Sequence, residues 1–170
     1  MSWNEGSGRY GLKQETKYPF DNKIRIQVSA SQPADFTLNV RIPAWATPNP
    51  MMAVNGKQVS DPVQPGTFAG IRRTWKDGDR VELELPMPVR LETVDENHPN
   101  LVALVQGPLV LFAIADSQPR FDRNALLQAK PANNTTGDWL ATAADGSSVT
   151  MRPFMNIDKE SYSTYVLLKA

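Results

Sequence analysis

The chain contains no cysteine, and its 170 residues include a single histidine, His98. The absence of cysteine excludes disulfides, thiol nucleophiles, zinc–thiolate sites and iron–sulfur clusters, and it fits any compartment. With one histidine, most histidine-based catalysis is excluded as well. We therefore expect no metal site and no cofactor.

An excess of basic charge is also missing, because 18 Lys and Arg residues balance 18 Asp and Glu residues. Proteins that bind nucleic acid usually carry such an excess, so we expect no nucleic-acid partner. No apolar run is long enough for a membrane-spanning helix, and we expect no signal peptide in the polar residues 1–10. The composition predicts a soluble globular chain that buries roughly 70% of its unfolded surface.

Apolar and polar residues alternate over residues 24–28, 36–42 and 81–85. This period of two is typical of antiparallel strands with one buried face and one wet face. Asn55-Gly56 lies between apolar residues and is a strong signal for a tight hairpin. Asp77-Gly78 predicts a second turn, which joins a strand ending at Trp75 to the strand at 81–85.

The pattern changes after residue 100. Residues 101–105 and 109–114 are continuous apolar runs separated by Gln106-Gly107-Pro108, which predicts a bulge, bend or turn. Such runs indicate strands covered on both faces, one face by the sandwich core and the other by an appended segment or a further domain. Between 116 and 148 the alternation fades, although residues 122–130 favour a short helix. Residues 162–168 predict a last strand.

These patterns predict an all-β protein of about ten to twelve strands with at most one short helix. The expected architecture is an antiparallel β-sandwich, jelly-roll-like, with a loop-rich C-terminal extension. We place the sandwich core at residues 1–115 and the extension at 116–170. We expect the last strand of the extension to join the sandwich or pack on it.

Seven short motifs follow one another along the first two thirds of the chain. They are Tyr18-Pro19-Phe20-Asp21, Phe36-Thr37-Leu38, Arg41-Ile42-Pro43-Ala44-Trp45, Val54-Asn55-Gly56, Trp75-Lys76-Asp77-Gly78-Asp79, Leu85-Pro86-Met87 and Gly107-Pro108-Leu109-Val110. Their order and spacing resemble the β-sandwich region after the catalytic barrel in β-L-arabinofuranosidase-like glycoside hydrolases, which form glycoside hydrolase family 127 and its relatives. The segment 152–157, followed by Tyr162 and Tyr165, is similar to the closing segment of the same proteins.

The resemblance implies part of a hydrolase rather than a complete one. In that family the catalytic site lies on an upstream (α/α) barrel and uses a cysteine nucleophile with a zinc ion held by cysteines and a glutamate. This chain has no cysteine, so no catalytic residue can be transferred to it. The expected function is a non-catalytic ancillary domain of a bacterial glycoside hydrolase, which packs against the upstream barrel and stabilises it. The resemblance also implies the periplasm or secretion, with the cytoplasm left open.

A second hypothesis is a carbohydrate-binding module that recognises plant or host glycans through exposed aromatic residues. Sugar rings present apolar C–H faces that stack on such side chains. Trp139 lies in the loop-rich part of the chain and is the best candidate for exposure. Trp45 follows a proline at the end of a strand and is the second candidate, although a place in the core or at the sandwich edge is the simpler interpretation.

A third hypothesis is a free-standing hydrolase that uses Glu82 and Glu84 as acid and base, since both lie on one face of a strand. The simpler interpretation is the wet face of an amphipathic strand. The turn carboxylates of Asp77, Asp79, Asp95 and Glu96 could hold Ca²⁺, but Asp-Gly-Asp is also ordinary turn chemistry. His98 lies in a polar loop without a nucleophile partner, which favours a solvated side chain.

Overall fold

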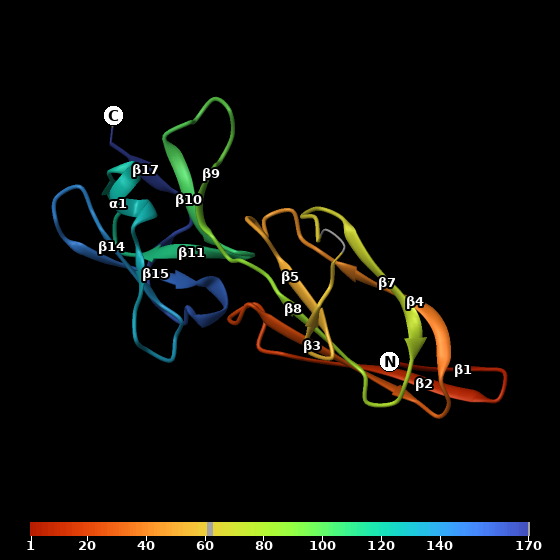
Figure 1. Ribbon diagram of the computed structural model, residues 1–170. Coiled ribbons are helices and arrows are strands. Elements are labelled where there is room, and N and C mark those ends of the chain that lie inside the picture. Colours follow the sequence, from red (N-terminus) through yellow and green to blue (C-terminus); the bar gives the residue numbers. More distant parts are fainter. Residues whose placement is uncertain (61–62, 170) are drawn as a thin grey trace. The chain divides into compact units, whose positions relative to one another are not determined.

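The structure is a computed structural model that describes residues 1–60 and 63–169 (Figure 1). Within this described part the chain forms seventeen strands, one short α-helix and one 3₁₀ turn, so the all-β prediction is confirmed. The number of strands exceeds the expected ten to twelve because many of them have only two to four residues. Such short pairings leave little periodicity in the sequence.

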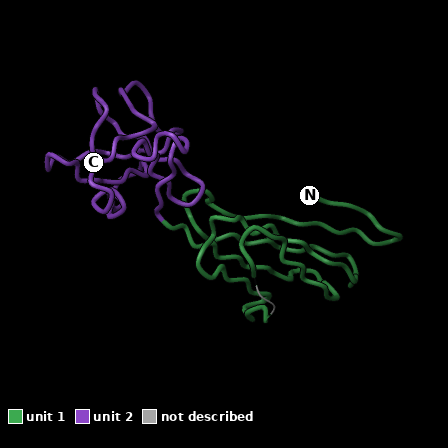
Figure 2. The backbone as a smooth tube through the Cα atoms, turned by 90° about the horizontal axis from the view of Figure 1, so that it is seen from above, with its two compact units in different colours: residues 1–88 green, residues 89–170 purple. Residues whose placement is uncertain are grey.

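The chain folds as two compact units, residues 1–88 and residues 89–170 (Figure 2). The sequence places a boundary after residue 115, but this point falls inside the second unit. The strand at 109–114 pairs with strands at 148–153 and 162–163, so the apolar run and the C-terminal extension share one sheet. Pro86 and Pro88 mark the observed boundary, where the missing amide protons end the ladder of the first unit.

Unit 1 is an antiparallel sandwich of eight strands. They are β1 (Ser2–Glu5), β2 (Gly8–Thr16), β3 (Lys23–Ala30), β4 (Ala34–Arg41), β5 (Met51–Val54), β6 (Lys57–Gln58), β7 (Phe68–Trp75) and β8 (Arg80–Glu84). A six-stranded sheet has the order β1-β2-β3-β8-β5-β6, and β4 pairs with β7 in a second sheet. The hairpin of β1 and β2 carries none of the predicted alternation and was not expected from the sequence.

The two sheets of unit 1 bury one hydrophobic core. Val28, Val81 and Leu83 from the larger sheet share a cluster with Leu38 and Trp75 from the smaller sheet. The predicted alternation over 24–28, 36–42 and 81–85 is therefore confirmed as the core-facing and wet faces of β3, β4 and β8. Burying these side chains supplies the main driving force for folding, at about 25 cal/mol per Å² of apolar surface.

Both predicted turns of unit 1 are present. Asn55 and Gly56 have φ angles of 51° and 77°, which are the positive values that a type I′ hairpin turn requires. Gly78 has a φ of 80° and lies between β7 and β8. The Asn55-Gly56 turn closes the β5–β6 hairpin, and β5 in turn pairs with β8, so the outward side chains of these strands lie next to each other.

Unit 2 contains one nine-stranded sheet with a short helix. Its elements are β9 (Val89–Thr93), β10 (Leu101–Gln106), β11 (Leu109–Ile114), β12 (Arg120–Phe121), α1 (Arg123–Leu127), β13 (Lys130–Pro131), β14 (Trp139–Thr142), β15 (Ser148–Pro153), the 3₁₀ turn η1 (Phe154–Asn156), β16 (Tyr162–Ser163) and β17 (Val166–Leu168). Gly107 and Pro108 form the predicted turn between β10 and β11. The single strand expected at 162–168 is instead two strands, because β16 pairs with β11 and β17 pairs with β10 and β12.

The core of unit 2 lies under one face of its sheet. Leu104, Leu111 and Met151 from the central strands meet Phe121 and Leu126, the latter from α1. β10 is buried on both faces, as its apolar run predicts, whereas β11 alternates between buried and half-buried residues. The second face of β11 therefore carries apolar side chains that the core does not cover.

Candidate functional site

Trp139 is half-buried rather than exposed. It pairs with Met151, whose side chain is fully buried, and it packs against the core of unit 2. Because directly paired residues share a face of the sheet, the indole lies on the core side of β14. The structure therefore gives Trp139 less exposed surface than its sequence context indicates, and its role in sugar binding stays a prediction.

Trp45 is also half-buried, and it packs against the core of unit 1. Its ring is stacked on the ring of Tyr18, with centroids 6.4 Å apart and planes 14° from parallel. Tyr18 is exposed, so this aromatic pair lies at the edge of the sandwich core. Sequence reasoning did not connect the two residues, since 27 positions separate them along the chain.

Three aromatic residues gather on the outward face of unit 2. The rings of Phe112, Phe154 and Tyr162 lie 5.3–6.0 Å apart in tilted and edge-to-face pairs. Phe154 is 58% exposed and Tyr162 is 47% exposed. We call these three residues the aromatic cluster. The signal that could have located it is the outward position of Phe112 within the apolar run 109–114.

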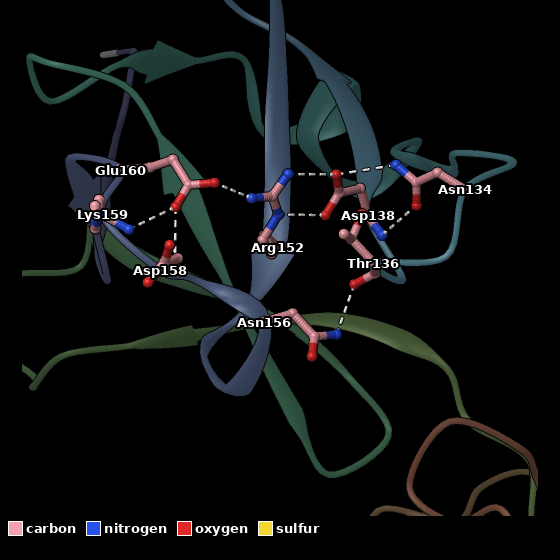
Figure 3. Close-up of polar contacts among 8 residues, drawn as sticks. All are labelled: Asn134, Thr136, Asp138, Arg152, Asn156, Asp158, Lys159 and Glu160. Atoms are coloured by element: carbon pink, nitrogen blue, oxygen red, sulfur yellow. Dashed lines mark hydrogen bonds and ion pairs between the residues drawn. The ribbon is translucent and has the colours of Figure 1, made fainter.

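Figure 3 shows a polar network centred on Arg152. The network adjoins the aromatic cluster, because Arg152 pairs with Phe112 across β11 and β15. Arg152 donates from Nε to Asp138 Oδ1 at 2.7 Å and from Nη2 to Asp138 Oδ2 at 2.8 Å. Its Nη1 donates to Glu160. Asn134 also donates from Nδ2 to Asp138 Oδ2 at 3.0 Å.

The network joins three segments that the sequence separates. Asp138 precedes β14, Arg152 lies on β15, and Glu160 follows η1. Glu160 Oε2 accepts the backbone amides of Asp158 and Lys159 at 2.9 and 3.0 Å (Figure 3). The Arg152 guanidinium and the carboxylates of Asp138 and Glu160 are therefore all hydrogen-bonded within unit 2, which favours a structural role over a catalytic one.

The charges of the network match this role. The hydrogen bond from Arg152 holds the pKa of Asp138 below its usual value, against the opposing effect of burial. Reciprocally, Asp138 raises the pKa of Arg152. Asp138 is only 4% exposed, so the carboxylate depends on this pairing.

Glu82 and Glu84 lie on the outward face of β8, beside a cleft of about 680 Å³. Arg25 Nη2 is 3.5 Å from Glu82 Oε1, and Asn22 Nδ2 donates to Glu84 Oε1 at 3.2 Å. Both carboxylates are half-buried and close to polar side chains. This setting agrees with the wet face of an amphipathic strand.

The turn carboxylates of Asp77 and Asp79 are used in hydrogen bonds within unit 1. Asp79 accepts Asn55 Nδ2 at 2.8 Å and the amide of Lys76 at 2.9 Å, while Asp77 accepts the amide of Ala30. Burial opposes the lowering of the Asp79 pKa, but these hydrogen bonds and Arg73 keep it below its usual value. Across residues 1–60 and 63–169, no three His, Cys, Asp or Glu side chains are grouped as metal ligands.

His98 is the remaining candidate. Its Nδ1 lies 2.8 Å from Asp95 Oδ1 in an exposed loop, as the solvated interpretation predicts.

In the described part of the chain, no helix has the length and apolar character needed to cross a membrane.

Residues 1–87 match the model of the family described as β-L-arabinofuranosidase, GH127 middle domain. The match coincides with unit 1 to within one residue. No curated protein matches the chain.

Solved structures match nearly the whole chain. One described as a glycoside hydrolase is 24% identical, with a TM-score of 0.77, and covers 95% of this chain and 33% of its own. A GH127 β-L-arabinofuranosidase from Geobacillus stearothermophilus T6 is 24% identical, with a TM-score of 0.77 and coverages of 99% and 32%. A GH127 β-arabinofuranosidase is 22% identical, with a TM-score of 0.71 and coverages of 99% and 33%.

The chain thus spans about a third of the length of these structures, and the likeness shows a shared fold. The match of residues 1–87 extends over half of the chain. The chain belongs to the GH127 β-L-arabinofuranosidase family, with residues 1–87 as the middle domain of that family.

Proposed function

We propose that the chain is a non-catalytic ancillary part of a glycoside hydrolase, which packs against an (α/α) catalytic barrel of the same parent protein and stabilises it. The main support is the family match, because a middle domain lies between other parts of a longer protein. The relatives of known structure are about three times as long as this chain. The reaction of the parent is proposed to be β-L-arabinofuranoside hydrolysis, as in the GH127 relatives.

The aromatic cluster supports the packing role. Phe154 and Tyr162 leave about half of their surfaces uncovered, and Met155 beside them is 57% exposed. Solvated apolar surface of this kind marks interaction sites on folded proteins. Aromatic side chains also contribute a large part of the binding energy at protein interfaces.

The arrangement of the carboxylates supports a non-catalytic role. Asp138 is held by Arg152, and Asp79 is held by Asn55 and Lys76, so the two carboxylates that are buried among the described residues serve the fold. A glycosidase of the two-carboxylate type needs one acid whose pKa is raised by its surroundings. Among the described residues, the resolved shifts of Asp and Glu side chains are all in the opposite direction.

Co-expression of this chain with the barrel of the proposed parent, as two separate polypeptides, tests the proposal. The chain alone should not hydrolyse an aryl β-L-arabinofuranoside. The mixture should co-purify and unfold at a higher temperature than the barrel alone. Phe154→Asp should weaken the association by at least about tenfold, since it places a charge in an apolar contact.

Phe68→Asp is the matched control, because Phe68 in unit 1 is also exposed and lies outside the cluster. It should leave the association unchanged. Hydrolysis by the isolated chain, or a folded chain that does not associate with the barrel, would refute the packing role.

The alternative is a carbohydrate-binding module, and the pair of Tyr18 and Trp45 favours it. The stacked rings offer an exposed aromatic edge to a sugar. If the alternative holds, Trp45→Ala should abolish oligosaccharide binding in a folded protein, and Trp139→Ala tests the second candidate in the same way. Unchanged binding in both variants would exclude these two sites.

A further inference from the structure

The outward face of the six-stranded sheet in unit 1 carries the cleft of about 680 Å³. Its floor comes from cross-strand neighbours on β3, β8 and β5. Arg25 pairs with Glu82, which pairs in turn with Ala53. One step along the strands, Glu84 pairs with Lys23 on one side and with Met51 on the other.

A small residue produces the hollow. Ala53 points outward, because its neighbours Met52 and Val54 are both buried in the core. It lies between the long side chains of Glu82 and Gln58. Because the side chain of Ala53 is only a methyl group, the sheet surface is hollowed at this position, and the longer polar side chains around it form the walls of the cleft. The resulting volume is within the usual range of ligand pockets, roughly 300–1,000 Å³.

The polar groups around the hollow are only partly used within the protein. In the part of the chain that the structure describes, Arg25 has one hydrogen-bond contact through its guanidinium, at 3.5 Å to Glu82. About half of the Arg25 side chain is exposed. Several of its donors, and acceptor positions on Glu82, are therefore free to face a ligand.

The charges are mixed rather than of one sign. Lys17, Lys23 and Arg25 lie among Glu15, Asp21, Glu82 and Glu84. A ligand with a strong charge of either sign would meet repulsion from one of the two sets. A neutral molecule rich in hydroxyl groups can donate to the carboxylates and accept from the guanidinium and ammonium groups at the same time. Met51 is 48% exposed and offers an apolar contact for a ring face.

We infer that this cleft binds a neutral carbohydrate segment, with Arg25 and Glu82 as its polar anchors and Ala53 as its floor. Neither Trp45 nor Trp139 lines this cleft, and the inference does not depend on the packing role proposed above. The chain would thus hold a sugar on unit 1 whether or not it also docks to a barrel.

Isothermal titration calorimetry of the 170-residue chain with neutral arabino- and galacto-oligosaccharides measures Kd and tests this inference. In NMR spectra recorded with the same sugars, the methyl resonance of Met51, assigned with Met51→Leu, should shift and saturate. Ala53→Phe fills the cleft and should raise Kd by at least about tenfold. Aromatic residues are favourable in β-strands, so we expect this variant to fold. Glu82→Gln removes a charged acceptor and should raise Kd by about tenfold as well.

Arg80→Gln is the control, since Arg80 lies on β8 but does not line the cleft. It should leave Kd within about twofold. Circular dichroism and the ¹⁹F NMR signal of fluorotryptophan at buried Trp75 verify that each variant is folded. The inference is overturned if neither neutral sugar shifts Met51, or if Ala53→Phe binds as tightly as the original chain. Tighter binding of an oligogalacturonate than of the neutral sugars would overturn the neutral class of ligand.

Discussion

Arg152 donates two parallel hydrogen bonds to Asp138, from Nε to Oδ1 at 2.7 Å and from Nη2 to Oδ2 at 2.8 Å. Both side chains are largely buried, at 16% and 5% exposure. A bidentate pair of this kind fixes the orientation of both groups as well as their distance. It ties the loop before β14 to β15 and so holds the edge of the sheet in unit 2.

Removing this guanidinium should destabilise unit 2 strongly. Arg152→Ala leaves the Asp138 carboxylate buried without its cation, which costs about 3–5 kcal/mol in the free energy of unfolding. Trp139 is the single tryptophan of unit 2, so urea unfolding followed by ¹⁹F NMR of fluorotryptophan reports on this unit. Arg123→Ala changes an exposed arginine and should cost less than about 0.5 kcal/mol. Equal costs for the two variants would show that the pair contributes nothing specific.

Acid should weaken unit 2 through the same carboxylate. Arg152 lowers the pKa of Asp138 in the folded state, and an unfolded Asp has a pKa of about 3.9. The stabilisation is therefore complete above this unfolded value and is lost as the pH falls through the folded value. Asp138→Asn should lose less stability than the original chain between about pH 5 and pH 2. Parallel pH profiles for the two proteins, measured through Trp139, would contradict the assignment.

Two substitutions of Asn55 in the hairpin turn should lower the stability of unit 1 by different amounts. Asn55 combines a φ of 51° with side-chain bonds to Asp79 Oδ1 and to the amide of Arg80, each of 2.8 Å. Asn55→Gly keeps the backbone freedom and loses the two bonds, at a cost of about 1–2 kcal/mol. Asn55→Ala loses the two bonds and also the tolerance of a positive φ, so it should cost about 1 kcal/mol more than the glycine variant. Urea unfolding of unit 1, followed through Trp75, measures the order, and an alanine variant as stable as the glycine variant would exclude the backbone contribution.

Two phenylalanines of unit 2 should differ sharply in their contribution to stability. Phe121 is fully buried, so Phe121→Ala should cost about 3–5 kcal/mol. Phe154 is 58% exposed and keeps only its aromatic pairs with Phe112 and Tyr162, so Phe154→Ala should cost about 1 kcal/mol. Thermal unfolding of both variants measures the difference. A large loss for Phe154 would mean that the aromatic cluster serves the fold of the isolated chain rather than a partner.

Elements with a local signal could be predicted from the sequence. The alternation at 81–85 and the Asn55-Gly56 turn depend on neighbours within a few residues, and the structure confirms both. Residues 122–130 favour a helix by composition, and α1 lies within them. The resemblance added the family, because the order of several short motifs carries more information than any one of them.

The functional surfaces could not be predicted in the same way. The aromatic cluster forms because Tyr162 pairs with Ile114 across β16 and β11. This contact joins distant segments of the chain, so it produces no periodic pattern in the local sequence. The exposure of Trp139 depends on which face of β14 meets the core, and a four-residue strand gives too little alternation to decide this. The cleft depends on an alanine between longer neighbours from other strands, which only the cross-strand register reveals.

The position of β17 has a consequence for how the protein is made. This strand pairs with β10 on one side and β12 on the other, so residues 166–168 connect segments synthesised long before them. Unit 1 takes all its strands from the first 84 residues and can close while translation continues. Unit 2 has to wait, with residues 101–102 of β10 and the short strand β12 lacking this partner, until Val166 and Leu168 leave the ribosome. A chaperone that shields strand edges would therefore act on the second half of the nascent chain and not on the first.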